Sequence, residues 1–140
     1  MKATMMLCDA AQAVDGKLYV LGGGWSMTPT PTGPLALAVK LEVPWPDADL
    51  LHIWSLELRD ADGHPVVLGG DAVRIDGSMH VGRPQGVPAG TPTDAVVALS
   101  FGPLPLVPGR YEWLFSVRGA EEHIESLAFQ ALPRPEVVPE

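Results

Sequence analysis

The side chains that could carry out chemistry are scattered along the 140 residues. The four histidines are His52, His64, His80 and His123, and none lies within five residues of another. Zinc-binding pairs usually stand two to five residues apart, so the spacing predicts no metal site. A composite site remains as an alternative, in which a small enzyme or metal-dependent protein uses His80 or His123 with nearby carboxylates.

Other short motifs are incomplete. Residues 60–63 begin like a calcium-binding loop, but that loop needs glycine at its sixth position and glutamate at its twelfth, where this chain has Pro65 and Asp71. We therefore interpret residues 60–63 as a turn between strands. No serine stands in the Gly-x-Ser-x-Gly frame of hydrolases, and the glycines at 22–24 lack the spacing of a phosphate-binding loop. The sequence assigns no catalytic residue and predicts no cofactor.

The net charge, the apolar runs and the number of cysteines indicate which partners and which cell compartment to expect. The net charge is −8, and the nine lysines and arginines stand singly, so we expect no nucleic-acid partner. The amino terminus lacks the long apolar core of a signal peptide, and no apolar run approaches the length of a membrane span. The single cysteine, Cys8, cannot form an internal disulfide, and we interpret it as a small buried side chain. These features predict a cytoplasmic protein with no membrane partner.

The sequence predicts an all-β fold, an antiparallel β-sandwich of about nine short strands. Glycine and proline number 15 each, and apolar residues alternate with polar ones at strand spacing. We expect strands at 2–8, 17–21, 35–43, 52–60, 65–68, 72–75, around Met79 and Val81, at 94–101, at 110–118 and within 122–132. Residues 9–14 are expected to form a turn or short helical piece, and Asp76-Gly77 a turn. One domain would cover residues 1–132, followed by a disordered proline-rich tail at 133–140.

The best-defined corner of the fold is predicted around residue 110. Pro108 and Gly109 form a turn that leads into alternation, with Tyr111 as the first residue of the apolar face. This pattern is similar to the tyrosine corner of immunoglobulin-like sandwiches, although their cysteine pair is absent. We expect Tyr111 to be buried, with its hydroxyl bonded to the backbone near the corner.

Four further residues are candidates for an interface. Trp25 and Trp45 stand at strand ends, where aromatic residues either anchor partners or pack as a lid over the core. Ala36 and Ala38 lie on the second face of residues 35–43 and would leave it flat and exposed. Such a face needs a covering segment or another subunit, and we predict a homodimer through a sheet face or edge.

Two stretches together indicate a family. The chain has Asp-Gly-Lys-Leu-Tyr-Val-Leu-Gly-Gly-Gly-Trp at 15–25, then Val-Pro-Gly-Arg-Tyr at 107–111 followed by Phe-Ser-Val-Arg-Gly at 115–119. In this order and length it resembles a family of small uncharacterised bacterial proteins. That resemblance implies a single all-β domain and no known activity. The hypothesis is a non-catalytic binding or assembly module of the bacterial cytoplasm; the alternatives are the histidine-based enzyme and a phage-derived accessory structural protein.

Overall fold

The computed structural model describes residues 1–119 and 125–135, and their regular structure is β apart from one short 3-10 turn. The elements are β1 (Lys2–Cys8), β2 (Ala10–Val14), β3 (Lys17–Leu21), β4 (Met27–Pro29), β5 (Leu35–Val43), η1 (Trp45–Asp47), β6 (Leu51–Asp60), β7 (Val67–Leu68), β8 (Asp71–Ala72), β9 (Arg74–His80), β10 (Thr93–Phe101), β11 (Gly109–Val117) and β12 (Glu125–Leu132). The all-β prediction is confirmed, with more strands than expected. Tail positions 136–140 and residues 120–124 lie outside the described residues. No helix in the described ranges is long and apolar enough to cross a membrane.

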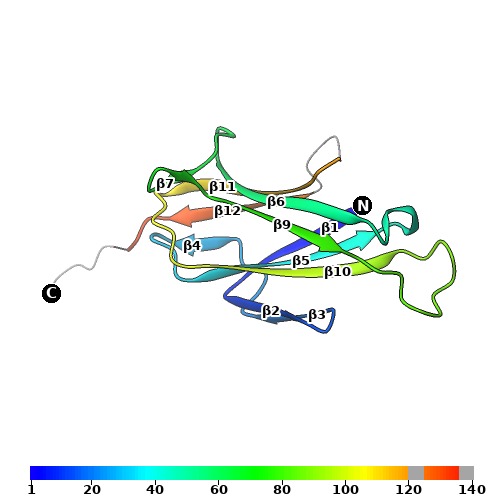
Figure 1. Cartoon of the computed structure of the whole chain (residues 1–140). Coiled ribbons are helices and arrows are strands. Elements are labelled where there is room, and N and C mark those ends of the chain that lie inside the picture. The colour runs from blue at the N-terminus through cyan, green and yellow to red at the C-terminus, as the bar shows by residue number, and fades with distance from the viewer. Residues whose placement is uncertain (120–124, 136–140) are drawn as a thin grey trace.

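The strands are arranged in three layers (Figure 1). A five-stranded sheet has the order β4-β12-β11-β6-β9, and a three-stranded sheet has the order β1-β5-β10. The two sheets share one hydrophobic core, in which the rings of Phe101 and Trp113 lie with centroids 4.9 Å apart. The β2–β3 hairpin forms the third layer, on the outer side of the three-stranded sheet.

β5 is the central strand of the three-stranded sheet. Its bounds, Leu35–Val43, are those predicted from the alternation, and its five branched aliphatic side chains are buried in the core. It pairs antiparallel with β1 along one side and with β10 along the other. Both backbone edges of β5 are therefore used, and an association through its edge is ruled out.

The expectation of a wholly antiparallel arrangement is wrong at one edge of the five-stranded sheet. The short strand β4 pairs parallel with β12. The loop after β4 is held to the same strand, because the Thr30 hydroxyl donates to the Leu132 carbonyl at 2.8 Å. The chain thus passes here from the five-stranded sheet to the three-stranded sheet, in which β5 lies.

Two segments predicted as turns are strands. Residues 10–14 form β2, because they pair with β3 and pack on the sheet below, which outweighs the weak strand preference of an alanine-rich segment. Asp76 and Gly77 lie inside β9, and Gly77 faces the large ring of Trp54 across the β6–β9 ladder. The glycine leaves room for that ring, so an Asp-Gly pair that resembles a turn signal sits in the middle of a strand.

The corner before β11 has the hydrogen bond expected from the sequence. Pro108 precedes the strand, Gly109 is its first residue, and Tyr111 is buried. The Tyr111 hydroxyl donates to the carbonyl oxygen of Val107 at 2.7 Å. Its ring also stacks on Phe129 of β12, with centroids 5.7 Å apart. The bond therefore joins the entering loop to the middle of the five-stranded sheet.

Candidate functional site

The β2–β3 hairpin covers the small residues of β5. Ala36 and Ala38 are only 1% and 4% exposed, and they form a second apolar cluster with Cys8. Ala11 of β2 and Leu18 of β3 pack against this cluster. The expected flat face exists, but a segment of the same chain covers it. Ala36 and Ala38 are therefore wrong as candidates for contact with another subunit.

The outer face of this hairpin is apolar and exposed. Residues at alternate positions point away from the sheet, and they include Tyr19, which is 57% exposed, and Leu21, which is 71% exposed. An open cavity of about 430 Å³ lies along the hairpin, lined by Ala10, Gln12, Tyr19 and Leu21 of the outer face and by Ala11 and Val20, which alternate with them on the side of the sheet. No lining residue carries a charge. We call these six residues the hairpin surface.

The sequence of β3 itself indicates this surface, although no residue of β3 was among the four predicted interface residues. Residues 17–21 are apolar at Leu18 and Val20 and also at Tyr19 and Leu21, so both faces of the strand are apolar. A strand that covers a core with one face alone alternates between apolar and polar residues. The second apolar face of β3 therefore indicates a contact in addition to the one with the sheet beneath.

The two candidate tryptophans are half-buried and packed within the chain. Trp25 meets Phe129 edge to face, with centroids 6.4 Å apart, at the margin of the main core. The Arg83 guanidinium lies 4.2 Å from the centre of the Trp45 ring and also donates to the Trp45 carbonyl oxygen at 2.6 Å. Trp25 thus packs against the main core and Trp45 against Arg83, and the hairpin surface contains neither ring.

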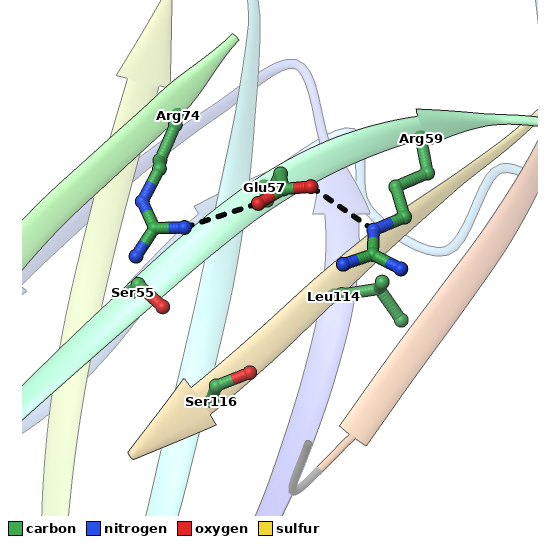
Figure 2. A pocket seen from close by; sticks show the side chains of 6 residues that line it. All are labelled: Ser55, Glu57, Arg59, Arg74, Leu114 and Ser116. Carbon is green, nitrogen blue, oxygen red and sulfur yellow. Dashed lines mark hydrogen bonds and ion pairs between the residues drawn. The ribbon is translucent and has the colours of Figure 1, made fainter. Parts of the chain in front are cut away.

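A second feature is a polar pocket on the outer face of the five-stranded sheet (Figure 2). Its volume is about 320 Å³, and it is lined by Ser55, Glu57, Arg59, Arg74, Leu114 and Ser116. Glu57 lies at its centre with only 14% of its side chain exposed. Its Oε1 accepts from Arg59 Nε at 3.0 Å, and its Oε2 accepts from Arg74 Nη1 at 3.1 Å. We call these six residues the arginine pocket.

Strand register brings the members of this pocket together. Glu57 and Arg59 are outward residues of β6, and Arg74 is directly opposite Glu57 on β9, although 17 residues separate them in sequence. Ser55 stands opposite Ser116 on the other side, in the β6–β11 ladder. Glu57 and Arg59 stand two residues apart on one strand and therefore share a face, whereas the position of Arg74 follows only from the pairing of β6 with β9.

Of the predicted site at His80 and His123, the described residues include only His80. His80 is exposed on β9, and His123 lies outside the described residues. The one group with metal-ligating atoms within reach of each other in the described ranges is Asp60, Asp62 and His64. Asp60 Oδ1 there accepts the backbone N–H groups of both Asp62 and His64 at 3.0 Å. These bonds close the predicted turn.

The single cysteine is buried at the end of β1. Its Sγ lies 3.4 Å from the carbonyl oxygen of Ala36, to which the thiol donates. Burial raises the pKa of the Cys8 thiol, and the charge of Asp9 raises it further. Because the thiolate is the reactive form, this environment disfavours a nucleophilic role.

Comparison with known families gives one match. Residues 3–130 match the model of a family of unknown function, DUF6941. No curated protein matches the chain. The match spans both sheets and the hairpin.

Proposed function

The chain belongs to the DUF6941 family, and we propose that it is a non-catalytic assembly module that forms a homodimer through its hairpin surface. The observation that carries this proposal is the uncharged, exposed apolar lining around Tyr19 and Leu21. Exposed apolar surface of this kind marks association sites. The corner bond of Tyr111 supports the further proposal of an immunoglobulin-like sandwich over residues 1–132. The acidic composition and single thiol suit the bacterial cytoplasm.

Charge supports a contact at this position. Two copies with a net charge of −8 repel one another, so they associate most readily where their own charges are absent. The hairpin surface meets this condition. Its charged neighbours lie at the two ends of the hairpin, with Asp15 and Lys17 at the turn and Asp9 near Leu21. The Leu21 carbonyl oxygen accepts from the Asp9 N–H at 3.0 Å.

Hairpin geometry supports two-fold symmetry. Antiparallel strands from two identical subunits are related by a two-fold axis, the commonest symmetry of homo-oligomers. An axis near Tyr19 brings Lys17 toward the Leu21 end of the other hairpin, where the partner's Asp9 lies. Each subunit then supplies Lys17 and Asp15 at one end of the rim and Asp9 at the other, while Tyr19 and Leu21 supply the apolar centre.

Light scattering after size-exclusion chromatography tests the proposal. At micromolar concentration we expect twice the chain mass of 14.9 kDa. Leu21→Glu places a charge in the apolar centre and should give the single-chain mass. Leu51→Glu is the matched control, since Leu51 is 66% exposed on β6 of the other sheet, and it should remain dimeric. A wild-type mass of one chain excludes the homodimer, and a dimeric Leu21→Glu variant excludes this surface.

A further inference from the structure

Arginines gather on the side of the molecule opposite the hairpin. Among the described residues, outward positions of the five-stranded sheet, together with Arg118 just after β11, carry four of the six arginines in the chain and three carboxylates. The four arginines are Arg59, Arg74, Arg110 and Arg118, and the carboxylates are Glu57, Asp76 and Glu112. The described outward residues of this face thus carry one more positive than negative group, in a chain whose net charge is −8.

Two of these arginines are held in place by carboxylates and keep further N–H groups that bond to no described residue. Arg59 uses Nε for Glu57, and Arg74 uses Nη1 for Glu57 and Nε for Asp76, at 3.1 Å. The Arg59 Nη groups and Arg74 Nη2 have no hydrogen-bond partner among residues 1–119 and 125–135. The carboxylates therefore fix the guanidinium planes, and the remaining N–H groups are available to a ligand. Figure 2 shows the two guanidinium groups on either side of Glu57.

Two serines supply the floor of the pocket. Ser55 and Ser116 are directly opposite each other, and their short side chains leave a depression between longer neighbours. Within the described part of the chain neither hydroxyl has a hydrogen-bond partner. A second cavity, of about 300 Å³, shares Ser55, Ser116 and Arg74 with the first and extends to Arg118. The two cavities form one groove across β9, β6 and β11.

We propose that this groove binds an acidic peptide segment through one of its side-chain carboxylates. Arg59, Arg74 and Arg118 bring three positive charges to the groove, and Glu57 and Asp76 bring two negative charges. The excess of one positive charge matches a single carboxylate better than a doubly charged phosphate. Guanidinium N–H groups and the two serine hydroxyls are all donors, which a carboxylate accepts. The groove is longer than one carboxylate, so an extended segment fits it better than a free ion.

Arginine Nε–Hε resonances in a ¹⁵N NMR titration test this proposal directly. The probe is acetyl-Gly-Glu-Gly-amide, and acetyl-Gly-Gln-Gly-amide and sodium acetate are titrated at equal ionic strength. We expect saturable shifts of the Arg59 and Arg74 signals with the glutamate peptide at millimolar concentration, and none with the glutamine peptide. Arg74→Gln should weaken binding by about tenfold or more, because a charge-assisted bond is lost.

Arg110→Gln is the matched control. Arg110 is an outward residue of β11 on the same sheet, it lines neither cavity, and its loss changes the net charge equally. Binding by this variant should stay within about twofold of wild type. Ser116→Ala provides a second variant if Arg74→Gln unfolds, and it should weaken binding about threefold or more.

Three results would overturn the proposal. They are absence of a saturable shift with the glutamate peptide, equal weakening by Arg110→Gln and Arg74→Gln, and equal affinity for acetate and the peptide. The last result would reduce the groove to a site for small carboxylates. The titration is repeated with Leu21→Glu, so its outcome does not depend on the homodimer.

Discussion

Gly77 of β9 lies directly opposite Trp54 of β6, and the indole ring occupies the space that a side chain at position 77 would need. Trp54 also stacks on Phe115 of β11, with ring centroids 5.8 Å apart. The ring is therefore held between two neighbouring strands and cannot move aside easily. A glycine inside a strand normally weakens it, but here it makes room for a core aromatic residue.

Gly77→Ala should destabilise the protein by about 1–3 kcal/mol, the usual range for overpacking in a rigid core. Chemical denaturation measures the change in the free energy of unfolding. Gly102→Ala is the control, because a Cβ at Gly102 meets no atom within 4 Å and its backbone has no positive φ. Equal stability of the two variants would show that the Trp54 ring can shift at little cost.

Tyr111→Phe should lower the free energy of unfolding by about 1 kcal/mol, since it removes the hydrogen bond to the Val107 carbonyl and keeps the buried ring. The shift of the urea midpoint measures the loss. Tyr19→Phe is the control, because the Tyr19 ring is exposed on the hairpin. It should leave the midpoint unchanged at a concentration where wild type and variant have the same mass. An unchanged midpoint for Tyr111→Phe would contradict the corner assignment.

Stability should fall as the pH rises above about 9. Burial, with the Asp9 charge, raises the pKa of the Cys8 thiol above its ordinary value of 9.0, so the folded state holds this proton more tightly than the unfolded state. Stabilisation from the thiol is therefore complete below about pH 9 and is lost as the pH rises through the folded-state pKa. Burial also raises the pKa of Tyr111 above 10.0, which extends the fall.

Cys8→Ala separates these two contributions. Urea denaturation from about pH 7 to about pH 11 should show a fall that begins at higher pH in the variant, because the raised pKa of Tyr111 then sets its start. A constant loss of stability across all pH values is expected as well, from the missing sulfur atom. The pH at which the fall begins is the informative quantity. Parallel profiles for wild type and variant would refute the role of the thiol.

Ala38→Leu should push the hairpin off the three-stranded sheet. Ala38 is buried under the layer to which Leu18 belongs, so added side-chain volume must displace β2 and β3 or strain the sheet. Hydrogen exchange should speed up across residues 10–21 while the amides of β6 and β11 keep their protection. Ala128→Leu is the control, since Ala128 is half-buried on the outer face of the five-stranded sheet. Unchanged exchange in the hairpin would contradict its assignment as the cover of Ala38.

The alternation along the chain was enough to predict the bounds of three strands. The bounds predicted for β1, β3 and β5 are those of the structure. Each of these strands is short, and each ends at a proline, a glycine or an aspartate that interrupts the pattern. The corner at Tyr111 was predictable for the same reason, because a local turn and a local alternation define it.

Pairing between segments far apart in the chain decided the features that the alternation did not predict, namely strand β2 and the arginine pocket. Residues 10–14 are a strand because β3 pairs with them and because the alanines of β5 provide a flat surface beneath. The arginine pocket exists because Arg74 stands beside Glu57 in the β6–β9 register, and a shift by one residue would place Arg74 on the core face. The sequence alone determined which residues alternate; only the tertiary structure decided which faces meet, because register and layer order depend on packing between segments far apart in the chain.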